Sequence, residues 1–203
     1  AVRAAGAAGH AVHADLSTTE GIHKFLEELD RTAPKVDILV NNAGSLVRRS
    51  TITEYSESLY DSIMNLNVKS LWFVTKACVP HMIEQKAGAI VNVSSIAARN
   101  GGGPGATMYA AAKAAVSAIT KGLAKELAPK GIRVNAISPG TVDNHFHEVF
   151  STRSVLDTVV AATPAGRLGT NEDMANAILY LCSRQADYIH GQTIEINGGH
   201  FMI

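Results

Sequence analysis

Short apolar segments alternate along this chain with longer segments of helical periodicity, and this alternation restricts the fold more than any other feature. Residues 36–40, 89–95, 132–138 and 193–196 are apolar runs of strand length, and 10–16 alternates as a strand does. Apolar residues recur at helical spacing over 18–32, about 57–86, 107–128 and 171–184. Such alternation builds βαβ units, so we expect one α/β domain over 1–203 with a doubly wound, Rossmann-like parallel sheet.

Polar residues and glycines follow four of the expected strands. They are Asp15-Leu16, Asn41-Asn42-Ala43-Gly44, Ser94-Ser95 and Pro139-Gly140. The carboxyl ends of parallel strands lie along one edge of a sheet, which is where such folds bind their ligands. The sequence therefore predicts a ligand site at this edge.

Composition excludes several classes of partner. Lys plus Arg and Asp plus Glu number 18 each, so no net charge draws the chain to nucleic acid or to an anionic membrane. The two cysteines, Cys78 and Cys182, match no metal or disulfide spacing. No apolar run approaches the roughly 20 residues that cross a bilayer, and no signal peptide is visible. We expect a cytoplasmic protein that acts on a small molecule.

Tyr109 and Lys113 are the pair that suggests chemistry. They lie four residues apart in an expected helix and so share one face. A tyrosine titrates near pKa ~10, and a nearby ammonium favours the phenolate and lowers that pKa. The pair predicts a general acid or base, although the same spacing occurs often on helices without any function.

Two other residues, Ser95 and Asn67, strengthen this interpretation. Ser95 ends a strand and precedes Tyr109 by 14 positions, with the glycine-rich segment 100–106 between them. Adjacent strand residues point to opposite faces, so only one of Ser94 and Ser95 can reach the site, and Ser94 stays the alternative at this point. Asn67 lies inside a helical segment, where asparagine is mildly disfavoured, so it has either a solvated face or a specific role.

The ordered set of motifs resembles the short-chain dehydrogenase/reductase family, and the likeness runs from about residue 10 to Asn197-Gly198-Gly199. Within that family the chain looks most like the group of 3-oxoacyl-carrier-protein reductases and sugar or polyol dehydrogenases. The motifs that carry the resemblance are Asn41-Asn42-Ala43-Gly44, Asn67, Ser95, Tyr109 with Lys113, and Pro139-Gly140.

The resemblance implies an enzyme that transfers a hydride between NAD or NADP and a carbonyl or secondary alcohol. Tyr109 would be the acid/base, Lys113 would lower its pKa and bind the nicotinamide ribose, Ser95 would donate to the substrate oxygen, and Asn67 would hold a proton-relay water. The implied coenzyme contacts, besides Tyr109 and Lys113, are Asp15, Leu16, Asn41, Asn42, Ala43, Gly44, Pro139, Gly140, Thr141 and Val142. A homotetramer or homodimer is also implied.

The resemblance also implies a glycine-rich phosphate loop in a first strand–helix–strand unit that these 203 residues do not contain. Without the loop's backbone donors, a chain that begins at Ala1 is expected to bind a dinucleotide poorly. The strand that selects NAD or NADP belongs to the same unit, so the coenzyme preference is not predicted. The alternative function is a non-catalytic, inactive binding or scaffold protein of the same fold.

Two further clusters, a pair of histidines and a pair of arginines, each have more than one interpretation. His145 and His147 could suggest a metal site, but no third ligand has suitable spacing, so we expect no metal and a substrate loop instead. Arg48 and Arg49 could bind an anionic substrate or a coenzyme phosphate, or could simply be solvated.

Overall fold

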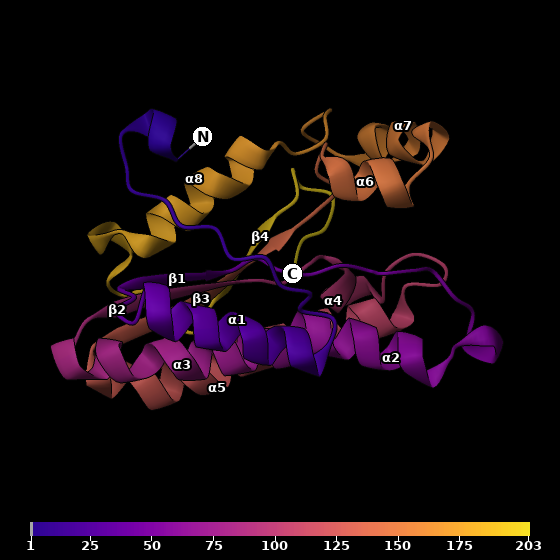
Figure 1. The fold of residues 1–203 in the computed structure, drawn as a ribbon. Helices are drawn as coiled ribbons and strands as arrows, with labels where there is room; N and C mark the ends of the chain where they lie inside the picture. Colours follow the sequence, from indigo (N-terminus) through magenta and orange to yellow (C-terminus); the bar gives the residue numbers. More distant parts are fainter. Residues whose placement is uncertain (1) are drawn as a thin grey trace.

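A parallel sheet of four strands, in the order β1-β2-β3-β4, forms the centre of the molecule (Figure 1). The structure is a computed structural model that describes residues 2–203. The strands are β1 (Ile38–Asn41), β2 (Gly88–Val93), β3 (Ile132–Pro139) and β4 (Thr193–Ile196). All three pairings are parallel, as expected for crossovers through helices. The predicted α/β fold with a parallel sheet is confirmed.

Of the eight α-helices within the described residues, α1 precedes β1 and the other seven connect consecutive strands. They are α1 (Thr19–Thr32), α2 (Glu57–Met64), α3 (Ser70–Gln85), α4 (Ala97–Asn100), α5 (Thr107–Leu127), α6 (His145–Phe150), α7 (Arg153–Ala162) and α8 (Asn171–Cys182). Single 3-10 turns cover Arg3–Ala5, Ile52–Glu54, Ala128–Lys130 and Arg184–Ala186. Side chains that accept from backbone N–H groups define several helix starts, including Thr18 before α1 and a reciprocal capping box of Thr170 and Asp173 before α8.

The sheet is packed on both faces. Helices α1, α3 and α5 form the layer below it in Figure 1, and α8 lies on the opposite side. On β2, Ile90 belongs to the core cluster of the α3 and α5 side, whereas its neighbour Val91 packs with Leu181 of α8. This alternation is what a strand covered on both faces requires.

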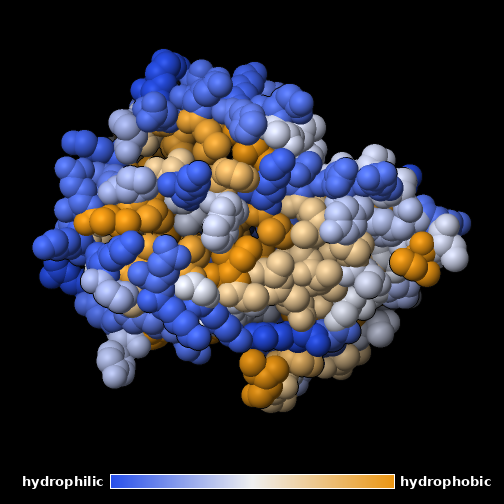
Figure 2. Space-filling view, turned by 90° about the horizontal axis from the view of Figure 1, so that it is seen from below, coloured by the Kyte–Doolittle hydropathy of each residue, from blue (hydrophilic) through white to orange (hydrophobic). Residues whose placement is uncertain are grey.

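The lower helical layer carries apolar surface. Figure 2 views this layer from below and shows hydrophobic and weakly hydrophobic residues across its middle, between hydrophilic margins. Trp72 of α3 is 45% exposed. No helix among residues 2–203 is both long enough and apolar enough to cross a bilayer.

The predicted strand over 10–16 is wrong. These residues are not in a strand, and Asp15 instead takes part in the turn that precedes α1. A strand requires a hydrogen-bonding neighbour, and in the described part of the chain β1 pairs only with β2. The alternating pattern was therefore correct for an extended segment but not sufficient for a strand.

The expected helix over 57–86 is continuous but irregular. Between α2 and α3 the segment Asn65–Lys69 is a π-helical turn, and Asn67 lies at its centre. Such turns contain one extra residue and often occur at functional sites.

Candidate functional site

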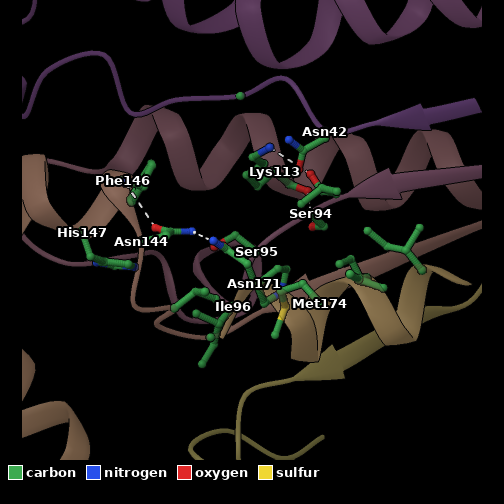
Figure 3. A pocket seen from close by; sticks show the side chains of 18 of the residues that line it. Asn42, Ser94, Ser95, Ile96, Lys113, Asn144, Phe146, His147, Asn171 and Met174 are labelled. Carbon is green, nitrogen blue, oxygen red and sulfur yellow. Dashed lines mark hydrogen bonds between the residues drawn. The ribbon is translucent and has the colours of Figure 1, made fainter. Parts of the chain in front are cut away.

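A cavity of about 470 Å³ opens at the carboxyl ends of β2 and β3. Figure 3 shows Asn42, Ser94 and Lys113 at one end of it and Asn144, Phe146 and His147 at the other, with Ser95 and Ile96 between them. These residues follow strands or lie on α5 and α6, so the fold brings segments far apart in sequence to one place. The ligand site predicted at this sheet edge coincides with this cavity.

Helix α5 contributes Tyr109 and Lys113 to the cavity from the same face. Lys113 Nζ lies 5.7 Å from the centroid of the Tyr109 ring. The ammonium donates to the carbonyl oxygen of Val93 at 2.9 Å, and the side chain is only 3% exposed. Burial disfavours the charged form and lowers the pKa of Lys113 to about 8.

The pKa of Tyr109 was expected to be lowered, but in the structure it is raised. Burial raises the pKa of the Tyr109 phenol, and a hydrogen bond with Ser95 offsets that rise only in part. Lys113 directs its ammonium to the backbone of β2, so desolvation decides the direction for Tyr109.

The two adjacent serines have different environments. Ser94 is buried, and its Oγ bonds to the Lys113 carbonyl oxygen at 2.9 Å and to Ser117 Oγ at 2.8 Å. Ser95 Oγ accepts from the backbone N–H of Ala97 at 3.1 Å and also bonds to Tyr109. The hydroxyl beside the phenol is therefore that of Ser95, whereas Ser94 supports helix α5.

Gly44 and Lys113 line the cavity, and Asn67 lies beside them, outside its lining. The Asn67 amide donates to the carbonyl oxygens of Ser45 at 2.8 Å and Ile63 at 2.9 Å. Its Oδ1 is buried and has no hydrogen-bond partner among the described residues. A Cβ on Gly44 would lie 2.6 Å from Lys113 Nζ and 2.8 Å from Asn67 Oδ1. Only glycine leaves room for this arrangement.

Of the residues at the carboxyl end of β1, one stabilises the sheet and the others line cavities. Asn41 Nδ2 donates to Thr75 Oγ1 at 3.0 Å and to Asn92 Oδ1 at 2.9 Å, so this side chain braces the sheet. Asn42 and Gly44 line the main cavity. Asn41, Asn42 and Ala43 also line a smaller cavity of about 120 Å³ together with Leu16.

Asp15 lies in the turn just before that smaller cavity. Its carboxylate accepts from the Ser17 hydroxyl at 2.7 Å and from the Ser17 backbone N–H at 3.0 Å. These two hydrogen bonds lower the pKa of Asp15. The fold therefore places Leu16 next to Asn41–Ala43, as expected. The Asp15 carboxylate, by contrast, forms hydrogen bonds within its own turn.

The end of β3 borders the main cavity through Pro139, Gly140 and Val142. A Cβ on Gly140 would lie 2.7 Å from the Cβ of Asn197, so the glycine lets the segment after β4 approach closely. Thr141 faces a different cavity, of about 230 Å³, beside Gly169. Of the four residues expected at the nicotinamide, three line the main cavity.

Sequence reasoning missed the contribution of helix α8. Asn171 and Met174 line the cavity, and Asn144 donates to Asn171 Oδ1 at 3.4 Å. Thr170 and Asp173 predict where α8 begins, but nothing in the pattern predicts that its first turn reaches the cavity. His147 was expected in a substrate loop and does line the cavity.

The two histidines of this segment have separate partners. His145 Nδ1 pairs with Glu148 at 3.0 Å, and His147 Nδ1 bonds to Ser151 Oγ at 2.9 Å. In the described part of the chain, no three His, Cys, Asp or Glu side chains are placed to hold a metal ion.

Known proteins similar to this chain were found by sequence and by structure. The family described as Enoyl-(Acyl carrier protein) reductase matches residues 1–200. The 3-oxoacyl-(acyl-carrier-protein) reductase of Thermotoga maritima is 39% identical over 185 residues, which are 91% of this chain and 74% of that protein.

Two solved structures are similar over almost the whole chain. The NADH-dependent reductase A1-R' responsible for alginate metabolism has a TM-score of 0.85 at 33% identity, with 99% of this chain and 79% of that one covered. A gluconate 5-dehydrogenase from Burkholderia cenocepacia in complex with NADP and tartrate has a TM-score of 0.87 at 31% identity, with 98% and 77% covered. On this combined evidence of motifs, fold and relatives, the chain belongs to the short-chain dehydrogenase/reductase family.

Proposed function

We propose that the protein transfers a hydride between a nicotinamide coenzyme and a carbonyl carbon or the carbon of a secondary alcohol. The observation that carries this proposal is the meeting of Ser95, Tyr109 and Lys113 at one cavity, with Asn67 behind them. The names of the similar proteins support it, since two are reductases, one of them described as NADH-dependent, and the third is a gluconate 5-dehydrogenase in complex with NADP.

The residues fit the nicotinamide end of such a coenzyme. Gly44 keeps the backbone free of any side chain beside Lys113 Nζ, and Pro139, Gly140 and Val142 border the same space. The coenzyme supplies the hydride or takes it up, and NAD and NADP both remain open. We further propose that Asp15, Leu16 and Asn41–Ala43 lie at its adenosine end.

Residues of the chain would transfer the proton to or from the substrate oxygen. In reduction, Tyr109 Oη would donate its proton to the substrate oxygen, and in oxidation it would accept one. Ser95 Oγ would donate a hydrogen bond to the same oxygen and stabilise the charge that develops there. The raised pKa of Tyr109 keeps the phenol protonated at neutral pH, which suits a group that must donate in the reductive direction.

Lys113 and Asn67 would replace the proton that Tyr109 gives away. The pKa of Lys113, about 8, is close enough to neutrality for the ammonium to release a proton and regain it. The unpartnered Asn67 Oδ1 lies beside Gly44, next to Lys113, and can accept a hydrogen bond from a water between them.

The variant Tyr109→Phe tests the proposal. It removes only the phenolic oxygen, and we expect kcat to fall by roughly 10²- to 10⁴-fold, the usual contribution of a general acid or base. The matched control is Tyr188→Phe, because Tyr188 is fully exposed. Turnover is followed by NADH and NADPH absorbance, and far-UV circular dichroism checks the fold.

Two results would count against the enzyme. Undiminished turnover in Tyr109→Phe would contradict the assignment of the acid/base. A natural polypeptide that gives no saturable fluorescence change with NADH or NADPH would instead favour the non-catalytic alternative.

We also expect more than one copy of the chain in the working protein, a homotetramer or a homodimer, and a location in the cytoplasm. The exposed Trp72 and the apolar surface of the lower helical layer support association (Figure 2). Light scattering during size-exclusion chromatography measures the number of copies.

A further inference from the structure

The end of the cavity far from Lys113 is polar, and this part is not used by the hydride chemistry. We call Asn144, His147 and Asn171 the polar wall; all three line the cavity, as Figure 3 shows. Phe146 also lines the cavity, with its ring centroid 5.9 Å from that of Tyr109. The cavity that Ser95 and Tyr109 line therefore continues to the polar wall.

His147 is fixed in orientation and keeps one nitrogen available. Its Nδ1 bonds to Ser151 Oγ at 2.9 Å, and its ring contacts the edge of Phe146 at a centroid distance of 5.1 Å. Nε2 has no hydrogen bond to any described residue. Burial, and secondarily the charge of Arg49, lowers the pKa of His147, so the ring is neutral at pH 7 and Nε2 can donate or accept according to the tautomer.

Asn171 is in a similar position. Asn144 accepts from the backbone N–H of Phe146 at 3.2 Å through Oδ1 and donates from Nδ2 to Asn171 Oδ1 at 3.4 Å. This leaves the Asn171 amide N–H groups without a partner in the described chain. Asn171 and His147 can therefore each offer a hydrogen-bonding group to substrate hydroxyls in the cavity.

A positive charge lies at the rim of the same wall. Arg49 donates to the carbonyl oxygen of Pro104 at 2.8 Å and to that of Phe150 at 3.3 and 3.4 Å, which places its guanidinium beside helix α6. No carboxylate in residues 2–203 forms an ion pair with it. The nearest acidic residue of α6, Glu148, pairs with His145, and both side chains are mostly exposed. The charge of Arg49 is thus not neutralised by an ion pair, and Arg49, which lies outside the cavity lining, is close enough to His147 of the polar wall to help lower its pKa.

We propose that the substrate is a small hydroxylated carbonyl acid, or the corresponding hydroxy acid, with hydroxyl groups on His147 and Asn171 and its carboxylate toward Arg49. This inference rests on the proposed function and names the substrate class of that same site. An acyl chain in the same place would bury His147 and Asn171 against methylene groups and leave their hydrogen-bonding groups without partners. It would also make no use of the charge of Arg49.

The test compares substrates that differ in one group. 5-Dehydrogluconate and L-sorbose have the same carbon chain and ketone, but the first carries a carboxylate where the second has a hydroxymethyl group. Acetoacetyl-coenzyme A represents the acyl thioesters. With the natural polypeptide and NADH or NADPH, we expect kcat/KM to be highest for 5-dehydrogluconate.

Variants of the two adjacent arginines separate charge from structure. Arg49→Met should lower kcat/KM for 5-dehydrogluconate by about five- to tenfold, the size expected for one partly solvated ion pair, and change that for L-sorbose much less. Arg48→Met is the matched control, because Arg48 is exposed and its side chain has no hydrogen bond in the described structure. His147→Phe should weaken both sugars through KM and spare any thioester activity.

The outcomes distinguish this inference from the proposed function. Equal losses for both sugars in Arg49→Met would make Arg49 only a tether of α6 and would overturn the carboxylate contact. Preference for L-sorbose or the thioester would overturn the substrate class while the hydride-transfer function stands. If none of the three substrates is turned over, thermal unfolding with gluconate and with sorbitol provides the test. The inference requires that gluconate raises Tm more than sorbitol does, and it fails if gluconate does not.

Discussion

Replacing Gly44 by alanine should damage the site through a single methyl group. The added Cβ would lie 2.6 Å from Lys113 Nζ and 2.8 Å from Asn67 Oδ1, whereas ordinary contacts are at 3.4 Å or more. One or both polar groups must therefore move by about 0.6 to 0.8 Å. Gly44 does not have a positive φ, so the cost comes from crowding and not from backbone strain.

Neither neighbour can move without losing a hydrogen bond. Lys113 is 3% exposed and is held at 2.9 Å from the Val93 carbonyl oxygen, and the Asn67 amide is held by two carbonyl oxygens. Overpacking of this kind costs about 1–3 kcal/mol. We expect Gly44→Ala to lose that much stability, and to lower kcat at least about tenfold because ~1.4 kcal/mol of misplacement at Lys113 is sufficient.

Urea unfolding of the natural polypeptide and steady-state turnover measure the two effects. The matched control is Gly122→Ala on α5, where a Cβ meets nothing within 4 Å. This control should be neutral or more stable by up to about 1 kcal/mol, because alanine is the better helix former. Wild-type stability and wild-type kcat in Gly44→Ala would refute the argument that Gly44 is a steric requirement of the site.

Two further predictions concern the groups around Lys113. Ser95→Ala should lower kcat by roughly 10²-fold with little change in the urea midpoint. Ser94→Ala should instead cost about 1–3 kcal/mol of stability, because the buried carbonyl and hydroxyl groups that Ser94 contacts lose a partner. If Ser94→Ala lost activity and Ser95→Ala lost stability, the roles of the two serines would be exchanged. Lys113 has a pKa of about 8 in the folded state against 10.5 ordinarily, so the unfolded chain binds more protons between these values and stability should rise with pH across that window. Lys113→Met should lack this rise, which amounts to roughly 3 kcal/mol. The prediction is contradicted if the free energy of unfolding, measured with urea, changes equally with pH in both proteins from pH 8 to 10.

The parts of the fold that depend on local pattern could be predicted from the sequence. Apolar runs gave β1 to β4 within a few residues, because buried parallel strands are apolar on both faces and end where polar residues begin. The position of the cavity followed from the parallel topology. The family resemblance then selected Ser95 over Ser94, and the contacts of the two hydroxyls agree with that choice.

What depends on neighbours in space could not be predicted. Residues 10–16 have the pattern of a strand, but strand formation depends on a partner that the segment itself does not contain. The direction of the Tyr109 pKa depends on the balance of burial against charge, and spacing along a helix reports only the charge. Arg49 was interpreted as solvated or as a ligand for an anion, and its hydrogen bonds to Pro104 and Phe150 join segments that no local pattern connects.

The π-helical turn Asn65–Lys69 implies a constraint on how this helix can change in evolution. An α-helix turns by about 100° per residue, so deletion of the one extra residue would rotate α2 by that angle relative to α3. Leu59 and Ile63, which pack against Ala112 of α5, would then turn away from their contacts, and Asn67 would move away from Gly44 and Lys113. Single-residue deletions in 65–69 should therefore be absent from active relatives.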